Sequence, residues 1–217
     1  MSTPFDLTHT DKLLTTTRSV RKRLDLDRPV PREVVLECLD IALQAPSGGN
    51  SQPWRWLIVD APDIRRGLAE LYRRSHDPYM AANREAAKAA GRLEAMGRIM
   101  DSSQHLSDHM GEVPVLVIPC LLSRPERLSQ GEIAGFYGSI LPAAWSLMLA
   151  LRSRGLGSAW TTLHLAFEQE AAELLGIPDT ATQTALIPVA YYTGDDFRPA
   201  PRKPAGKVTY FNTWKQR

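Results

Sequence analysis

The stretch QAPSGGNSQPWRWLIVD, residues Gln44 to Asp60, carries a helical pattern into an apolar strand through a long polar corner. Before the corner, apolar residues recur at helical spacing from Pro31 to Ala45, and a proline suits the first turn of a helix. After the corner, residues 54–60 form a short aromatic and β-branched run that is typical of a buried strand. Residues 46–53 therefore form a loop rich in proline, glycine, serine and amide side chains, between two regular elements.

The rest of the chain mixes helical and strand patterns. We expect helices over 63–74, 81–110, 134–154 and 168–175, and strands over 113–122, 158–163 and 183–194. The segment 134–154 has the most continuous helical pattern and is apolar on nearly all sides, so we place it at the centre of the molecule. Gly91 and Gly97 weaken the helix over 81–110. The length of 217 residues and the lack of an internal repeat or linker favour one α+β or α/β domain.

The composition favours a soluble, cytoplasmic protein. The N-terminal sequence lacks a basic head followed by an apolar stretch, so we expect no secretory signal. The longest nearly apolar run, Ile140 to Leu151, is far shorter than the roughly 20 residues that a membrane span needs. A net charge of +2, without a basic run interleaved with aromatic residues, does not indicate nucleic-acid binding. Cys38 and Cys120 lie in apolar patterns, where we expect reduced thiols and no disulfide.

Common catalytic motifs are missing from the sequence, which has no Walker-type phosphate loop, no Gly-x-Ser-x-Gly elbow and no paired-cysteine metal spacing. GLGSAW supplies two glycines of a dinucleotide fingerprint, but Trp160 stands at the third position, so we reject a Rossmann loop. His105 and His109 have a spacing that can bind a metal, with Glu112 nearby. Two surface histidines are the simpler interpretation, and we predict no metal site. His164, just after WTTL, is a further candidate, although we favour a satisfied or partly buried histidine over a catalytic one.

Basic residues gather near both ends of the sequence. TTTRSVRKR, residues 15–23, places Arg18, Ser19 and Arg21 within one turn, and guanidinium groups match phosphate oxygens in a bidentate way. Taken alone, this cluster is better explained as a solvated basic helix end. A second pair, Arg202 and Lys203, lies in a proline-fixed segment. Two distant clusters of like charge are tolerated best when an anion lies between them, so the pair of clusters favours an anion site.

Three separated pieces of the sequence resemble the flavin-dependent nitroreductase family. RSVRKR resembles the Arg-Ser-x-Arg phosphate site of that family, and APSGGNSQPWRWLIV resembles its Ala-Pro-Ser-x-x-Asn-x-Gln-Pro-Trp corner. ALRSRGLGSAWTTLHL resembles a helix end of the family, and the C-terminal PAPRKPAGKVTYFNTW extends the match over nearly the whole chain. The corner is the most specific piece because chance rarely gives so many identities within one loop.

The resemblance implies a fold, a cofactor and a homodimer. The family has an α+β nitroreductase-like fold with a central, mostly antiparallel sheet flanked by helices, and an intertwined homodimer that binds two flavin mononucleotides (FMN) at its interface. Residues 1–217 would be one flavin-binding domain, with a lid-like segment at about 78–111 and a dimer-wrapping tail at about 196–217. Tyr210, Phe211 and Trp214 suit such a tail because aromatic side chains need a surface to cover them.

The resemblance also assigns cofactor-binding residues. The phosphate and ribityl end of FMN would be held by Arg18, Ser19, Arg21, Arg202 and Lys203. The isoalloxazine ring would be lined by four residues of the other subunit: Pro46, Ser47, Gly48 and Asn50. Glycine allows a close approach to the ring, and asparagine offers it both a donor and an acceptor. Thr162 and Leu163 are expected near the hydride-accepting nitrogen, although AWTTL departs from the small residues or Glu-Gly pair that many members carry there.

By resemblance, the protein is expected to be an NAD(P)H-dependent FMN oxidoreductase of the nitroreductase type. NADH or NADPH would reduce the flavin and leave, and an electron-poor acceptor such as a nitroaromatic or quinone would follow in a ping-pong scheme. The cofactor carries the chemistry, so we expect no catalytic residue. Alternatives are a non-catalytic flavin-binding or redox-sensing protein, reductive dehalogenation and flavin fragmentation. Tyr79, Glu85 and Lys88 do not have the spacing of the clamp that binds iodotyrosines, which disfavours dehalogenation.

Overall fold

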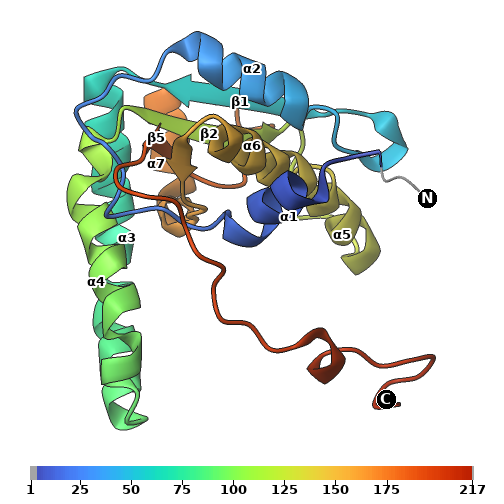
Figure 1. Ribbon diagram of the computed structural model, residues 1–217. Helices are drawn as coiled ribbons and strands as arrows, with labels where there is room; N and C mark the ends of the chain where they lie inside the picture. Colours follow the sequence, from blue (N-terminus) through green and yellow to red (C-terminus); the bar gives the residue numbers. More distant parts are fainter. Residues whose placement is uncertain (1–3, 217) are drawn as a thin grey trace. The chain divides into compact units, whose positions relative to one another are not determined.

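The computed structural model describes residues 4–216, which form two compact units (Figure 1). The central unit comprises residues 18–194, and the terminal unit comprises the described parts of 1–17 and 195–217. The central unit holds the whole β-sheet and every α-helix except α1. It therefore provides the scaffold on which most of the predicted cofactor-binding residues lie.

The central unit is built on a five-stranded sheet in which β1, β2, β5 and β3 are neighbours in that order and β4 pairs with β2. The strands are β1 (Trp54–Val59), β2 (Val115–Leu121), β3 (Leu156–Ser158), β4 (Thr182–Gln183) and β5 (Ile187–Tyr191). All four strand pairs are antiparallel, and the register of β1 on β2 runs from Trp54 opposite Leu121 to Val59 opposite Leu116. The α+β class and the mostly antiparallel sheet expected from the sequence are confirmed.

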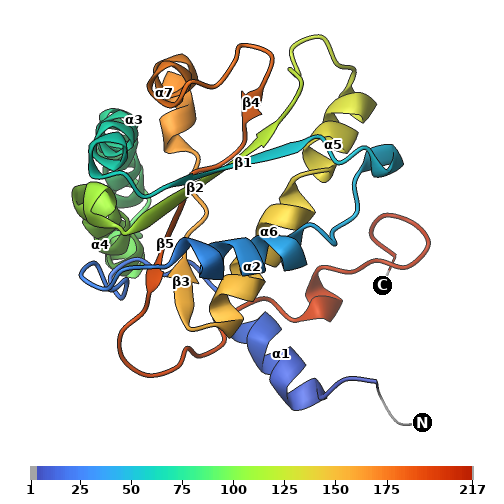
Figure 2. The same cartoon turned by 90° about the horizontal axis from the view of Figure 1, so that it is seen from above.

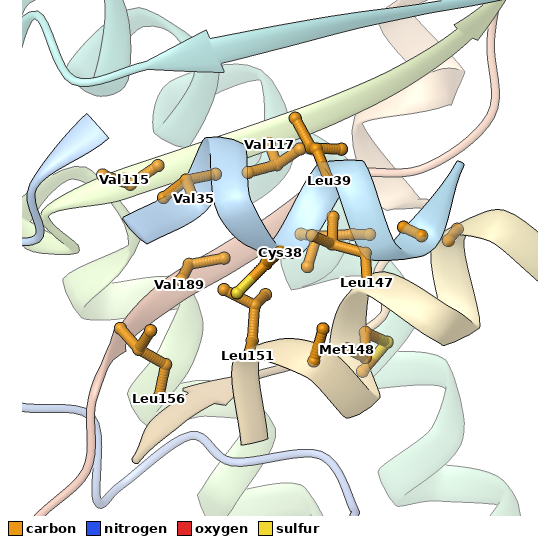
Figure 3. Packing of buried hydrophobic residues seen from close by; sticks show 14 of the residues in the cluster. Val35, Cys38, Leu39, Val115, Val117, Leu147, Met148, Leu151, Leu156 and Val189 are labelled. Atoms are coloured by element: carbon orange, nitrogen blue, oxygen red, sulfur yellow. The ribbon is translucent and has the colours of Figure 1, made fainter. Parts of the chain in front are cut away.

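One face of the sheet is covered by α2 (Arg32–Ala42) and α6 (Leu141–Ser153), with α7 (Glu168–Leu175) on the other side of the strands (Figure 2). Helix α2 buries Val35, Cys38 and Leu39, which recur at helical spacing and so share one face. They pack with Leu147 and Leu151 of α6 and with buried side chains of β2, β3 and β5 (Figure 3). This cluster holds the helix that leads into the corner firmly against the sheet.

A long helical hairpin is formed by α3 (Pro62–Ala89) and α4 (Leu93–His109), which run side by side in Figure 1. The turn between them contains Gly91 with a φ of 63°, a left-handed value that glycine adopts without strain. The hairpin carries a small core of its own, made of Met80, Ala87 and Met100. The structure thus divides the helical segment expected over 81–110 at Gly91, whereas Gly97 lies inside α4. Helix α3 also extends well beyond the predicted 63–74.

The prediction of one continuous helix over 134–154 is wrong. Helix α5 (Gln130–Gly138) ends before Ser139, and α6 begins at Leu141 with Pro142 in its first turn. Proline suits a first turn because its missing N–H has no helical acceptor there. The stretch Gln130–Ser153 is the one part of the described chain that is long and apolar enough by composition to cross a membrane. Core helices of soluble proteins meet the same test, so this property alone carries little weight.

Two predicted strands are only partly correct. The strand expected over 158–163 overlaps β3 at Ser158 alone, and residues 163–167 form the 3-10 helix η3 (Leu163–Phe167). Thr161 contributes an isolated bridge to Leu186 instead of a strand. The segment expected as one strand over 183–194 is divided into β4 and β5. The predictions for α2, β1, β2 and α7 are confirmed, and Gly176 ends α7 with a φ of 67°.

The terminal unit contains helix α1 (Leu7–Thr16) and the C-terminal segment, which has the short 3-10 helix η4 (Ala205–Lys207). Asp6 caps α1 by accepting a hydrogen bond from the backbone N–H of His9 at 3.1 Å. Lys12 of α1 forms an ion pair with Asp196 at 2.6 Å. Phe211 and Trp214 are 64% and 80% exposed.

Candidate functional site

The segment that carries Arg18, Ser19 and Arg21 is attached to the edge of the sheet. The backbone N–H of Val20 donates to the carbonyl oxygen of Ser158 in β3 at 2.9 Å, and Ser19 forms an isolated parallel bridge with the same residue. Gly157 makes this close approach feasible, because a Cβ there would lie 2.9 Å from the Cβ of Val20. The backbone between Arg18 and Arg21 is therefore held on β3, with its orientation set by the sheet.

Arg21 has an unusual electrostatic environment. It is half-buried, and among the described residues no carboxylate forms an ion pair with it. Burial lowers the pKa of its guanidinium, and the nearby guanidinium of Arg18 lowers this pKa further. Two neighbouring cations that disfavour each other attract an anion, and arginine forks bind phosphate oxygens well. This environment fits the phosphate site predicted for the segment.

The polar corner has a constrained backbone path. After α2, the chain passes through the 3-10 helix η1 (Gly48–Asn50), and Gly49, Asn50 and Gln52 have φ values of 57°, 52° and 47°. Such left-handed values are uncommon for residues other than glycine and often mark functional loops. Gly48, Asn50 and Gln52 are all exposed. The corner therefore presents backbone and amide groups to its surroundings.

Contacts behind the corner fix its position. The backbone N–H of Gly48 donates to Oγ of Ser139 at 3.0 Å, and the indole of Trp54 donates to the carbonyl oxygen of Ser139 at 2.5 Å. The Gln52 amide donates to Oδ1 of Asn50 at 2.9 Å, which helps to hold the left-handed turn. Ser139 was not singled out from the sequence, because nothing local links it to a corner some 90 residues earlier. Trp54 is buried as expected, and Gln52 shapes the turn.

The two threonines of the segment after β3 differ in burial and in hydrogen bonding. Thr161 is buried, and its hydroxyl donates to the carbonyl oxygen of Leu186 at 2.5 Å. Thr162 is exposed and precedes η3, and Leu163 is half-buried. Ser158, which contacts the arginine segment, lies four residues before Thr162 in the sequence.

The remaining predicted residues belong to the terminal unit. Arg202 and Lys203 are exposed in an extended part of the terminal unit, where Arg202 donates to the carbonyl oxygen of Pro201 at 2.9 Å. Within the central unit, the corner and the arginine segment lie on opposite sides, as both views show (Figures 1 and 2). Two surface hollows, of about 290 and 670 Å³, are lined by none of the predicted residues. One chain therefore does not gather all of the predicted site.

Comparison with known proteins agrees with this fold and with the order of the motifs. A model of the nitroreductase family matches residues 14–191, which include the arginine segment, the corner and residues 158–163. The chain belongs to the nitroreductase family. The match ends at the last residue of β5, so the terminal unit lies mostly outside it.

The relatives of this nitroreductase-family protein are named for different activities. A protein named NADH dehydrogenase from Thermus thermophilus is 28% identical over 206 residues, covering 88% of this chain and 90% of the relative. The crystal structure of oxidised iodotyrosine deiodinase with FMN and 3-iodo-L-tyrosine has a TM-score of 0.71 at 25% identity, covering 93% of this chain and 98% of the other. The FMN-dependent nitroreductase NfnB of Mycobacterium smegmatis, in complex with NADPH, has a TM-score of 0.69 at 21% identity, covering 96% of this chain and 100% of the other. The family therefore includes different chemistries on one fold.

The histidines of this nitroreductase-family protein do not form a metal site in the part of the chain that the structure describes, where no three His, Cys, Asp or Glu side chains gather around a possible ion. The rings of His105 and His109 lie 4.5 Å apart, and His109 contacts Glu112 at 3.2 Å. His164 is fully buried, neither ring nitrogen has a hydrogen-bond partner among residues 4–216, and burial lowers its pKa to about 4. His164 is therefore a neutral interior residue at neutral pH.

Proposed function

We propose that this protein is an FMN-dependent oxidoreductase that uses NADH or NADPH to reduce small electron-poor acceptors, such as nitroaromatics or quinones, by a ping-pong mechanism. Membership of the nitroreductase family supports an oxidoreductase. The observation that carries the cofactor assignment is the half-buried Arg21 beside Arg18 on the edge of β3, without a carboxylate partner for Arg21 among the described residues.

The residues present fit FMN at both of its ends. Arg18 and Arg21 supply guanidinium groups for a phosphate, and Ser19 between them adds a hydroxyl. At the corner, Gly48 and Gly49 leave the backbone free of side chains, and Asn50 still has amide N–H groups to donate while its oxygen accepts from Gln52. In this proposal, Arg202 and Lys203 add further positive charge to the phosphate.

Bound FMN would supply the redox chemistry, because its ring accepts a hydride from a nicotinamide and passes reducing equivalents to the acceptor. The protein would bind, orient and shield. The arginine segment would fix the phosphate end, and Thr162 and Leu163 would flank the reactive edge of the ring. Thr161 keeps that segment in place through its bonds to Leu186. None of these groups is required to act as an acid or base, so the proposal has no catalytic side chain.

The proposed site is shared by two copies of the chain. The corner and the arginine segment lie on opposite sides of the central unit, so a flavin that contacts both would take them from different protomers (Figure 2). This geometry supports the homodimer expected from the family resemblance.

The visible spectrum of the purified protein tests the proposal. We expect a yellow protein, or one that takes up added FMN, whose flavin absorbance is bleached by NADH or NADPH without oxygen and restored by a nitroaromatic or quinone. Failure to bind FMN would remove the proposal altogether. Binding without bleaching would favour the non-catalytic, redox-sensing alternative. Steady-state lines that intersect instead of running parallel would contradict the ping-pong scheme.

Deiodination is a second candidate, because iodotyrosine deiodinase is among the structural neighbours at 25% identity. Tyr79, Glu85 and Lys88 all lie on α3. At 1.5 Å of rise per residue, Tyr79 and Lys88 are separated by about 13 Å along the helix, which is too far for one amino-acid zwitterion. We therefore expect 3-iodotyrosine to leave the fluorescence of bound flavin unchanged. A saturable change would restore deiodination as a candidate.

A further inference from the structure

The polar corner is organised around one residue, Gln52. Its backbone N–H donates to Oγ of Ser47 at 3.1 Å, and its side-chain amide donates to Oδ1 of Asn50 at 2.9 Å. The φ of 47° at Gln52 is left-handed, a conformation that residues other than glycine adopt rarely and often at functional sites. Gln52 therefore contacts two of the polar side chains that are predicted to line the flavin ring.

The contacts of Gln52 determine how two side-chain amides are oriented. The amide nitrogen of Gln52 lies 2.9 Å from Oδ1 of Asn50 and 3.4 Å from the backbone carbonyl oxygen of the same residue. A backbone carbonyl oxygen can only accept, so the end of Gln52 that faces Asn50 has to be its N–H donor. The side chain of Asn50 then has to meet this donor with its oxygen. Its NH2 group is consequently turned away from Gln52.

The same contacts leave the corner with hydrogen-bond donors for a ligand. Among residues 4–216, neither the NH2 group of Asn50 nor the hydroxyl hydrogen of Ser47 has an acceptor, whereas an oxygen of each side chain accepts from Gln52. Asn50 is exposed and Ser47 is half-buried. A ligand that fits this corner presents acceptors to it, namely carbonyl oxygens or unprotonated ring nitrogens. The polar edge of a flavin ring carries such atoms.

We propose that Gln52 is a positioning residue that makes the corner a hydrogen-bond donor, by holding Oδ1 of Asn50 so that the NH2 group of Asn50 faces an acceptor atom of the flavin ring. This inference rests on the proposed function, because it takes FMN as the ligand. Donors that are held in place stabilise an atom that gains negative charge, and the ring of a flavin becomes more electron-rich on reduction. Gln52 therefore favours reduced FMN over oxidised FMN through Asn50.

The test measures the Kd for FMN, from the quenching of flavin fluorescence in a titration of apoprotein, and the midpoint potential of the bound flavin. Gln52→Met keeps a side chain of similar length and removes its amide. It should weaken FMN binding about three- to tenfold, as expected for the loss of one hydrogen bond, and lower the midpoint potential. Gln44→Met is the matched control, because Gln44 is exposed at the start of the same loop, and it should change neither quantity.

Gln52→Glu reverses the direction of the hydrogen bond to Asn50. A carboxylate can only accept, so the NH2 group of Asn50 would turn towards it and leave Oδ1 facing the flavin ring. An oxygen there repels the electron-rich reduced ring more than the oxidised ring. The ratio of the affinities for reduced and oxidised FMN should therefore fall about tenfold, which corresponds to a midpoint potential lower by about 30 mV for a two-electron couple.

Asn50→Ala distinguishes an effect of Gln52 through Asn50 from a direct effect on the ring or on the loop. Both Gln52 variants are made again in the Asn50→Ala background, where their effects on Kd and potential should largely vanish. Effects of the same size in that background would overturn the proposal, as would an unchanged Kd and potential in Gln52→Met. A parent protein that binds no FMN would overturn the proposed function itself, so the two failures are distinguishable.

Discussion

At the scale of single residues, Gly157 determines whether the arginine segment can lie on the sheet. A Cβ at this position would lie 2.9 Å from both Cβ and Cγ1 of Val20, and 3.2 Å from a methyl of Leu24. We expect Gly157→Ala to lower the free energy of unfolding by about 1–3 kcal/mol, the usual cost of overpacking, and to weaken FMN retention. Urea unfolding and flavin content of the purified variant measure the two effects.

Gly97→Ala is the matched control for this substitution. Gly97 lies inside α4, and an added Cβ would meet no atom within 4 Å. Alanine is favoured over glycine in helices by about 1 kcal/mol, so this variant should be as stable as the parent or more stable. If Gly97→Ala lowered the free energy of unfolding as much as Gly157→Ala, close packing of Gly157 on Val20 would not explain the loss of stability.

His164 makes stability depend on pH. Burial lowers its folded pKa from 6.5 to about 4, against a small opposing effect of Gln183. Between these values the unfolded chain binds a proton that the folded chain does not, so stability is lost as pH falls below 6.5. At 1.36 kcal/mol per pKa unit, this residue should cost about 2–3 kcal/mol of stability between pH 7 and pH 4.5.

The measurement is the urea midpoint at several pH values for the parent and for His164→Gln, which cannot titrate. The variant should lose less stability on acidification than the parent, by the amount given above. His9→Gln is the control, because His9 is exposed and hydrogen-bonded to Asp6 on the surface. Parallel pH profiles for the parent and His164→Gln would show that His164 does not resist protonation.

At the scale of elements, the end of α5 supports the polar corner. Oγ of Ser139 accepts from the backbone N–H of Gly48 and donates to the carbonyl oxygen of Gly135 at 2.9 Å. Ser139→Ala should destabilise the fold by about 1–2 kcal/mol, because it leaves a backbone donor without its partner. Amide hydrogen exchange over residues 47–52 should become faster, as measured by mass spectrometry.

Ser129→Ala is the control that distinguishes loss of the Ser139 contact with the corner from general damage to α5. Ser129 caps the start of α5 by its bonds with Glu132 and lies at the other end of the helix. This variant should destabilise α5 with little change in exchange at residues 47–52. Faster exchange at the corner in both variants would mean that the corner responds to the whole helix instead of the Ser139 contact.

The elements that the sequence predicts well are those with local causes. The corner, α2 and β1 follow from proline, glycine and apolar spacing within a short window, and Gly176 ends α7. The break between α5 and α6 also has a local cause, because α6 begins with Pro142 in its first turn, but apolar periodicity over 134–154 hid this signal. The 3-10 turn after Thr161 accompanies a pairing with Leu186. Periodicity contains no information about such a distant partner, so this turn was missed.

In the candidate site, too, residues with a local signal were predicted from the sequence, and residues that act through distant contacts were not. Motif order alone suggested Arg18, Arg21 and the corner residues, because their chemistry is local. Ser139 acts through contacts with the corner and with Trp54, both distant in sequence, and at the end of its own helix it looks like an ordinary residue. Helix α1 was also not predicted, although Asp6 gives it a recognisable N-terminal cap.

At the scale of the whole molecule, several features favour a partner subunit. Large apolar side chains are exposed on or beside α2, α5 and α6, among them Leu36, Leu43, Ile133, Leu141 and Trp145. Such side chains favour association when they form a continuous surface. The corner and the arginine segment also lie on opposite sides of the central unit (Figures 1 and 2). Both observations support a dimer in which each flavin site takes its corner from one protomer and its arginines from the other.

Complementation between two defective chains tests this arrangement. One chain carries Arg18→Ala with Arg21→Ala, and the other carries Ser47→Ala with Asn50→Ala. Each should retain little FMN as a homodimer. In a heterodimer purified through two different tags, a shared site would place both defects in one site and leave the other intact, so we expect one FMN per dimer. If each site were built from a single protomer, both sites would stay defective and the heterodimer would bind almost no flavin. A heterodimer of the parent with the arginine-deficient chain should bind one FMN in either case, and it calibrates the measurement.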